Sequence, residues 1–392
     1  MLKIYRIKTT SLLLCVLISC TNSFSQDKNA TKPRARDLSI PFDGKPGINN
    51  AITDVNGVLV GYKTLIKEAE KTATGNGPVR TGVTVIFPSG KTNTPNPAAW
   101  FSQNGDGEMT GLASIEDYGF NYGPIGITNT NSVGVVHDAI GEWNIKHFST
   151  GEAVDFSFGL PVVAETWDGV LNDIQGLHVQ KEDVFEALDN AKSGPVTEGN
   201  AGGGTGMVLY GFKGGNGTSS RIIRIDTSTY TVGVFMQANF GRRSELLVAG
   251  IPVGREIKGY EPVLHDPKRK DGSVIIIIAT NAPLLPSQLK LVAKRAAMGI
   301  ARTGSFAHNG SGDIFLAFST QSPPSTEKET HQIWNVLTKE ALDEVFKATV
   351  EATEESVINA LVAGETMTGL RGNTIYAIPH DQVKEILKKY NR

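Results

Sequence analysis

A serine begins the most apolar run of the chain and directly follows a glycine. Residues 268–283 read KRKDGSVIIIIATNAP, so five β-branched aliphatic residues follow Gly272 and Ser273. Such a run predicts a strand buried on both faces, which is a rigid platform for its first residue. If the chain were cut before Ser273, this residue would carry a hydroxyl group and an α-amine, and an amine with a pKa of about 8 can act as the local base.

Gly272 suits a cut made by the chain itself. A residue without Cβ tolerates the strained backbone through which the next hydroxyl attacks the preceding carbonyl. The alternative is a plain turn, KDGS, that leads into the strand. On local sequence alone this turn is the favoured explanation of the serine.

Other motifs that could do chemistry fit structural roles better. The EGNAGGGTGM of 198–207 lacks the Gly-Lys-Ser/Thr of a phosphate loop and the spacing of GxGxxG, which favours a tight turn. No GxSxG is present, and the SQLK of 287–290 has an SxxK spacing without SDN or KTG. The seven histidines are scattered without zinc-site spacing, so we expect neither a metal nor another cofactor.

The balance of charge narrows the class of partner. The 38 Lys and Arg residues nearly match the 40 Asp and Glu residues, with no long run of one sign. A nucleic-acid binder would show a basic footprint. A peptide or small-molecule partner is therefore expected, and no nucleic acid.

The first residues predict export rather than fold. Residues 1–19 combine three basic residues with a short apolar stretch, which is typical of a signal. LISC at 17–20 resembles a lipobox that is cut before Cys20, and SFS before Gln26 allows an ordinary cut after Ser25 instead. We expect a periplasmic protein or a membrane-anchored lipoprotein. Both cysteines, at 15 and 20, lie in this segment, so the body has no thiol nucleophile.

Strand patterns are mixed with helical patterns, which dominate the end of the chain, and together they predict an α/β or α+β layered body. After a linker over 20–45, β-branched segments bounded by Gly, Asn or Pro predict strands at 57–62, 81–88, 126–136 and 231–240. Helical spacing predicts a helix over 287–302, with Ser287 as its N-cap and Leu289, Val292, Ala293, Ala296 and Ile300 on one face. A second helical pattern runs from Trp334 to Leu361. With no internal repeat, one domain over 46–392 is expected.

Several blocks, in order, resemble the DmpA-type peptidases, which are the L-aminopeptidase D-amidase/D-esterases and β-aminopeptidases. The similar blocks cover nearly all of the body: NNAITDVNGVLVGYKTL, RTGVTVIFP, NGDGEMTGL, PIGITNTNSVGVV, FGLPVVAETWDGVLNDI, EGNAGGGTGM, DGSVIIIIATNAPLLPSQLK and NGSGDIFLAFST. The resemblance implies a four-layer αββα sandwich of the DmpA/ornithine acetyltransferase type, similar to the N-terminal-nucleophile hydrolases. It also implies self-cleavage at Gly272-Ser273 into an α chain, 46–272, and a β chain, 273–392.

The resemblance also implies roles for further residues. Ser311 and Asp313 match a serine and an acid that support proton transfer around the nucleophile, although some relatives have Glu at the second position. Asn239 matches an amide donor to the oxyanion. Glu165 matches a carboxylate that holds the substrate's free amino group, and Trp167 stands where relatives can have Tyr, with an indole N–H that could serve the oxyanion. From the residues alone, turn roles are favoured for Ser311, Asp313 and Asn239.

The expected function is that of a self-processing serine aminopeptidase. It would release the N-terminal residue of short peptides, amides or esters through an acyl-enzyme on Ser273. Two alternatives remain open: an acyltransferase of the ornithine acetyltransferase type and an unprocessed exported binding protein. L-peptides, D-alanyl amides and β-peptides all remain candidate substrates, and the resemblance suggests a homo-oligomer of αβ units.

Overall fold

The computed structural model describes residues 32–69, 74–149, 160–265, 272–322 and 333–392. The export signal and both of its candidate cleavage positions lie outside these ranges. In the described ranges, none of the helices combines the length and the apolar character that crossing a membrane requires.

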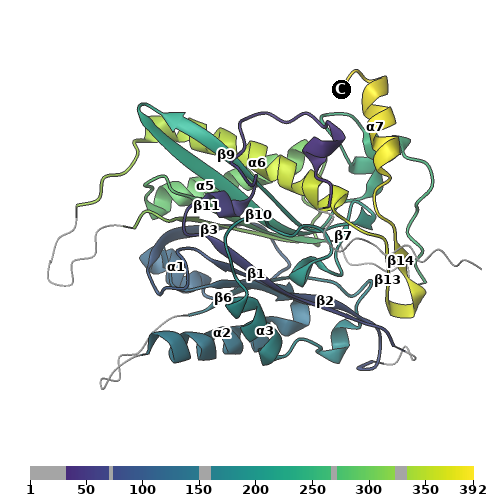
Figure 1. Cartoon of the computed structure of the whole chain (residues 1–392), viewed down its shortest axis with the longest axis horizontal. Helices are drawn as coiled ribbons and strands as arrows, with labels where there is room; N and C mark the ends of the chain where they lie inside the picture. The colour runs from purple at the N-terminus through teal and green to yellow at the C-terminus, as the bar shows by residue number, and fades with distance from the viewer. Residues whose placement is uncertain (1–31, 70–73, 150–159, 266–271, 323–332) are drawn as a thin grey trace, which may run out of the picture. The chain divides into compact units, whose positions relative to one another are not determined.

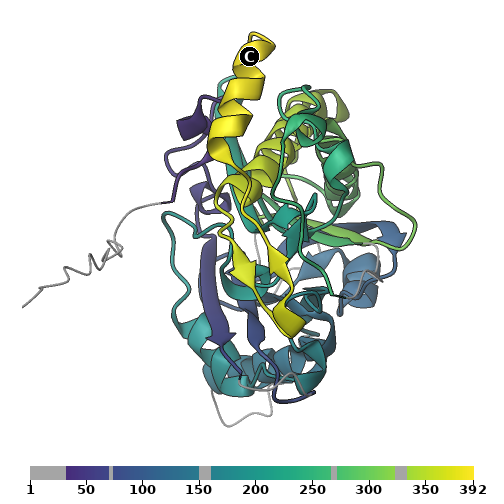
Figure 2. The same ribbon diagram turned by 90° about the vertical axis from the view of Figure 1, so that its right-hand side faces the viewer.

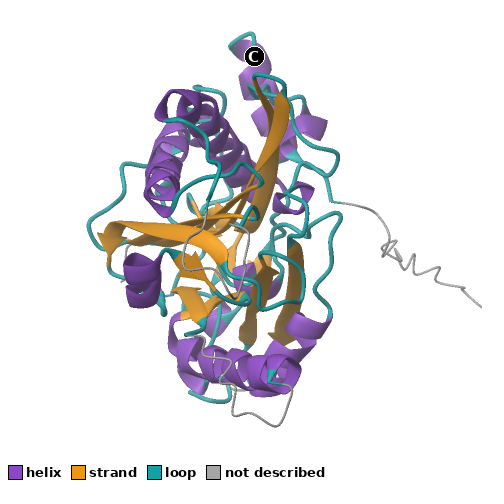
Figure 3. Cartoon of the chain, turned by 90° about the vertical axis from the view of Figure 1, so that its left-hand side faces the viewer, coloured by secondary structure: helices purple, strands orange, loops and turns teal. Residues whose placement is uncertain are grey.

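Two sheets lie face to face between two pairs of helices, as Figures 1 and 3 show. One sheet has the order β1-β2-β5-β6 (Leu59–Lys67, Val79–Phe87, Ile125–Asn129 and Val162–Thr166). The other has the order β4-β3-β12-β11-β10-β9 (Phe120–Asn121, Asn96–Gly105, Gly312–Ser319, Ser273–Thr280, Ser228–Asn239 and Gly215–Ile225). Helices α2 and α3 (Val133–Phe148 and Lys181–Asp189) cover the first sheet, and α5 and α6 (Pro286–Arg302 and Leu342–Val362) cover the second. The expected αββα sandwich is confirmed.

Shorter elements complete the body. They are α1 (Leu112–Tyr118), α4 (Val253–Glu256), α7 (His380–Lys389), the pair β7 and β8 (Val208–Leu209 and Phe212–Lys213) and the pair β13 and β14 (Met367–Thr368 and Thr374–Ile375). Figure 2 shows α7 and the β13–β14 pair on one side of the layers.

Strand β11 is buried on both faces, as its run of β-branched residues predicts. Val274, Ile276 and Ile278 pack into the core beneath α5 and α6. Ile275 and Ile277 pack into the core between the two sheets. The strand pairs with β10 in antiparallel and with β12 in parallel orientation, so its first residue is held from both sides.

Helix α5 confirms the predicted apolar face but not the predicted cap. All five residues expected on that face are buried. The helix begins at Pro286 with Leu285 as the N-cap, which places Ser287 inside the first turn. Proline is favoured at the first helical position, and the Gln288 side chain accepts a hydrogen bond from the Leu285 N–H at 2.8 Å. Lys290 of the SxxK pattern donates to Glu116 at 2.6 Å, so it does not activate Ser287.

Helix α6 is more buried than its apolar spacing predicts, and the cause lies at the other end of the chain. Residues 33–45, which the sequence analysis assigned to a linker, belong to the compact unit Pro33–Arg392. Arg36 Nε lies 2.7 Å from Glu355 Oε1, and the Ala35 N–H donates to Asn359 Oδ1 at 2.9 Å. This N-terminal segment therefore covers the polar side of α6, which pattern reasoning assigns to solvent.

Glu355 is the centre of this polar contact. Its Oε2 lies 2.8 Å from Arg221 Nη2, and the Asn50 amide donates to its Oε1 at 2.6 Å. Burial alone would raise the pKa of Glu355, but the hydrogen bond and charge of Arg36 and the charge of Arg221 hold that pKa below its ordinary value.

Glu355→Gln is therefore expected to lower the free energy of unfolding by about 3–5 kcal/mol, because buried Arg221 loses its nearer carboxylate and keeps only Glu351, 3.6 Å from its Nε. Denaturant unfolding of an uncut Ser273→Ala chain measures this loss within one molecule. Glu340→Gln is the matched control: Glu340 pairs with Lys339 at 3.6 Å on the surface, so a change of only about 0.5 kcal/mol is expected. Equal effects at the two positions would contradict the structural role of Glu355.

Candidate active site

Ser273 lies where three strands meet. It is the first residue of β11, only 3% exposed, and stands opposite Asn239 of β10 and Gly312 of β12. Its Oγ accepts a hydrogen bond from the Trp167 backbone N–H, which comes from the end of β6 in the other sheet, at 3.2 Å. Both sheets therefore contribute to the surroundings of this hydroxyl.

Gly272 is required here by space. A Cβ at this position would lie 2.1 Å from the Asn239 carbonyl oxygen and 2.5 Å from Phe240 Cα, which no side chain can occupy. The Gly272 carbonyl accepts from the Gly312 N–H at 3.3 Å, and this donor polarises the bond that a self-cleavage would attack.

Asn239 is fixed beside Ser273 by two hydrogen bonds. Its Nδ2 donates to the Trp167 carbonyl at 2.9 Å, and its Oδ1 accepts from the Val208 N–H at 2.9 Å. Because an amide nitrogen carries two hydrogens, this arrangement allows a second donation from Nδ2. Such a preorganised donor suits an oxyanion.

Trp167 contacts the nucleophile through its backbone. Its N–H and carbonyl bond to Ser273 and Asn239. Its indole lies against Gly169, where a Cβ would be 2.5 Å from the ring, and packs near Val208 and Leu171. The sequence predicts only a role for the indole N–H, because side-chain identity carries no signal for a main-chain donor.

Ser311 and Asp313 are joined and buried beside the start of β11. Ser311 Oγ donates to Asp313 Oδ1 at 2.6 Å, and Asn104 Nδ2 donates to Asp313 Oδ2 at 3.1 Å. The parallel register sets Gly312 opposite Ser273 and Asp313 opposite Val274, so both residues lie in β12 beside the start of β11. Burial raises the pKa of Asp313 above its ordinary value, although the bonds from Ser311 and Asn104 oppose the rise. A carboxyl group with a raised pKa accepts a proton more readily than an ordinary aspartate.

Glu165 approaches the same point from the four-stranded sheet. It is 3% exposed, and its carboxylate accepts from the Glu108 N–H at 3.1 Å and from the Thr130 hydroxyl. The loop that carries Gly107 is closely packed here, because a Cβ at Gly107 would lie 3.0 Å from Gly312 Cα and 3.3 Å from Glu165 Oε1. A buried carboxylate at this position is a candidate ligand for a cationic amine.

Asp168 is a further acid that sequence reasoning missed. It follows Trp167 directly and accepts from the Asn172 amide at 2.9 Å. Burial raises its pKa to about 7, although hydrogen bonds with Thr81 and Asn172 oppose the rise. Glu165 and Asp168, two buried acids with different hydrogen-bond partners, therefore stand on either side of Trp167 in the sequence.

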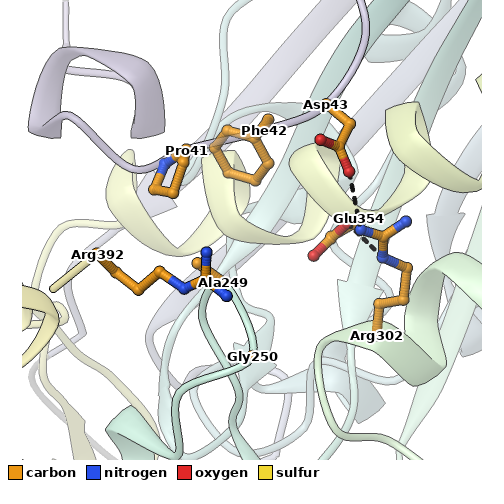
Figure 4. Close-up of a pocket in the computed structure, with 8 residues that line it drawn as sticks. All are labelled: Pro41, Phe42, Asp43, Ala249, Gly250, Arg302, Glu354 and Arg392. Carbon is orange, nitrogen blue, oxygen red and sulfur yellow. Dashed lines mark hydrogen bonds and ion pairs between the residues drawn. The ribbon is translucent and has the colours of Figure 1, made fainter. Parts of the chain in front are cut away.

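The structure also has a surface pocket that contains none of these residues. It has a volume of about 390 Å³ and lies between the N-terminal segment, Ala249, Gly250 and the helices α5 and α6 (Figure 4). Its Arg302 lies 2.7 Å from Glu354 and 3.5 Å from Asp43. These ion pairs join the N-terminal segment to both helices, so this pocket fits a structural role better than a catalytic one. Within the described ranges, no group of three or more His, Cys, Asp or Glu residues is arranged to hold a metal ion.

Comparison with known proteins places these features in a family context. The family model described as peptidase family S58 matches residues 50–375. A β-peptidyl aminopeptidase BapA of Sphingosinicella microcystinivorans is 50% identical over 378 residues, which are 93% of this chain and 94% of that protein. A second, from Sphingosinicella xenopeptidilytica, is 46% identical over 388 residues, which are 96% of each chain.

Solved structures agree with the fold. The L-aminopeptidase D-Ala-esterase/amidase of Ochrobactrum anthropi, described as a prototype for the serine aminopeptidases and a variant of the Ntn hydrolase fold, superposes with a TM-score of 0.86 at 45% identity, covering 92% of this chain and 99% of its own. A β-aminopeptidase of Burkholderia sp. superposes with a TM-score of 0.82 at 40% identity, covering 91% and 99% of the two chains.

Proposed function

Because the chain belongs to peptidase family S58, we propose that it releases the N-terminal residue of short peptides, amides or esters through an acyl-enzyme on Ser273. The chain is a hydrolase of the serine aminopeptidase class, and its substrates are peptides or amides. The relatives favour this activity over the acyltransferase alternative. The assignment of the site rests on one observation. The Ser273 hydroxyl accepts a hydrogen bond from the Trp167 N–H, and Trp167 follows the buried carboxylate of Glu165 by two residues.

The nucleophile is made by self-cleavage. Ser273 Oγ attacks the Gly272 carbonyl carbon, the Gly272–Ser273 C–N bond breaks, and the hydroxyl proton passes to the serine nitrogen. Water then hydrolyses the resulting ester, which leaves a carboxylate on Gly272 and a free α-amine on Ser273. The Gly312 N–H, 3.3 Å from the Gly272 carbonyl oxygen, supports the attack by polarising that carbonyl.

In turnover the new α-amine accepts the proton of Ser273 Oγ as this oxygen attacks the substrate carbonyl. Ser311 and Asp313, bonded at 2.6 Å, pass the proton on to the leaving amine. Asn239 Nδ2 stabilises the oxyanion, together with the Trp167 N–H. Glu165 binds the substrate's ammonium group, which restricts the enzyme to free N-termini.

The substrates of this chain include peptides with an N-terminal β-amino acid. Two relatives that are 50% and 46% identical to it are named β-peptidyl aminopeptidases. The L-aminopeptidase D-Ala-esterase/amidase at 45% identity supports L-peptides and D-alanyl amides as further candidates.

We propose that the protein is also exported. The basic and apolar pattern of residues 1–19 supports export, with cleavage before Cys20 and a lipid anchor there, or cleavage after Ser25 and release. The mature enzyme then works in the periplasm or on a membrane surface. We further propose that it assembles as a homo-oligomer of αβ units.

Two matched peptides test the activity: β-alanyl-leucine amide and its N-acetyl form. Acetylation is expected to lower kcat/KM by about 100-fold or more, because it removes the charge that Glu165 would bind. Hydrolysis should proceed without an added acyl acceptor, with liquid chromatography as the measurement. Equal rates on the two peptides would refute an aminopeptidase, and product only in the presence of an acceptor amine would favour the acyltransferase.

A further inference from the structure

A β-bulge sets an asparagine opposite the candidate catalytic acid. Strands β3 and β12 pair Asn104 with Asp313 but Ser102 with Ile314, so Gln103 is an extra residue in β3. Bulges bend a strand locally and redirect its side chains, and they are frequent next to active sites. With a regular register, the exposed Gln103 would face Asp313 instead.

The Asn104 amide joins Asp313 to the loop that carries Ser311. Its Nδ2 donates to Asp313 Oδ2 at 3.1 Å and to the His308 carbonyl at 3.0 Å, which accounts for both of its hydrogens. The other carboxylate oxygen of Asp313 accepts from Ser311. Each oxygen thus has its own donor, and the carboxylate has one preferred orientation.

The loop is itself attached to the part of the chain that precedes the cleavage position. His308 Nε2 lies 3.0 and 3.1 Å from the two carboxylate oxygens of Glu245, and the Leu247 N–H donates to the Thr303 carbonyl at 2.9 Å. The Asn104 amide therefore acts between two fixed points, the loop and the acid.

We infer that Asn104 is a positioning residue of the proposed reaction, whose amide orients the Asp313 carboxylate and stabilises its charged form. This inference rests on the proposed role of Asp313 in proton transfer. A donor to a carboxylate favours the ionised state, and a side chain held at both oxygens loses little orientation freedom before each turnover.

The pH profile separates this role from a purely structural one. The hydrogen bond from Asn104 lowers the pKa of Asp313, against the rise caused by burial, and the charge of His308 acts in the same direction as Asn104. Removal of the amide donor therefore raises that pKa. Asp313 must be ionised to accept a proton, so the acidic limb of the kcat profile moves to higher pH.

Asn104→Leu tests the inference with an uncharged side chain of similar size that has no amide donor. We expect kcat on β-alanyl-leucine amide to fall about 10–100-fold at pH 7, the acidic limb to move up by about one pH unit, and KM to change less than two-fold. Asn104→Ser, which keeps one donor, should lie between this variant and the wild type. Gln103→Ala, at the extra residue of the bulge, is the matched control and should behave as wild type.

The following outcomes decide between the roles. A wild-type acidic limb and kcat in folded Asn104→Leu would overturn the inference, as would an equal change in Gln103→Ala. If Asn104→Leu does not fold, the limb in Asn104→Ser decides in the same way. Asp313→Asn separates the role of Asp313 from that of Asn104. Full activity of Asp313→Asn would refute the proposed role of Asp313. Loss of activity in Asp313→Asn, with unchanged activity in the Asn104 variants, would refute only the positioning role of Asn104.

Discussion

Ser273→Ala is expected to leave the chain uncut and to lower peptide hydrolysis by about 10⁴-fold or more, because one hydroxyl serves both reactions. Intact mass and N-terminal sequencing of the purified protein measure the first effect. Wild type should yield a fragment that begins Ser-Val-Ile-Ile, and the variant a single chain. Ser273 is buried and the backbone at Gly272 is closely packed, so the backbone cannot shift when the hydroxyl is removed. The variant should therefore fold as the precursor does.

Two further variants make this result specific. Ser273→Cys supplies another nucleophile and is expected to restore some cleavage. Ser287→Ala changes the serine of the SxxK pattern on α5 and should leave cleavage and activity intact. If wild type and Ser273→Ala are both uncut, Ser273 is only a turn residue, and an unprocessed binding protein becomes the better description.

The β11 region shows how far local pattern reasoning reaches. An unbroken run of β-branched residues leaves a strand without a polar face, so both of its faces must be buried. Ile276 and Ile277 do pack into different cores. The same reasoning correctly predicted the apolar face of α5, because helical spacing determines it locally. Both elements depend on neighbours within a few residues.

The parts that sequence reasoning missed depend on contacts between distant segments. Glu355 is spaced as a solvent-facing residue of α6, yet it is buried because Arg36 pairs with it from 319 positions away. Asn104 reaches Asp313 only because of a bulge, which leaves no residue pattern. Trp167 contributes its backbone, and every residue except proline carries that donor.

The meeting of the site residues is likewise a property of topology. Glu165 belongs to one sheet and Ser273 to the other, and no spacing rule relates the two. The resemblance to a family supplied both residues as predictions, and the structure places them in different sheets. Residue chemistry alone favoured turn roles for Ser273, Ser311, Asp313 and Asn239.

Glu165→Gln is expected to lower kcat/KM for peptides with a free N-terminus by about 30–1000-fold, which corresponds to about 2–4 kcal/mol for loss of a charged partner. Glutamine has the same shape and can still accept from the Glu108 N–H, so the packing around Gly107 should persist. Self-cleavage should be unchanged, because the precursor presents no ammonium group to Glu165. Steady-state kinetics and a denaturing gel measure the two effects on one preparation.

The rates on the two peptides separate binding of the ammonium group from a structural role of Glu165. If Glu165 binds the ammonium group, the variant should lose its discrimination between β-alanyl-leucine amide and the N-acetyl form, whose slow rate should hardly change. Glu108→Gln is the matched control, since Glu108 contributes only its backbone N–H to Glu165 and its side chain is exposed. A uniform loss on both peptides would instead assign Glu165 a structural role, and the selection of free N-termini would then need another acid, for which the neighbouring buried Asp168 is the candidate.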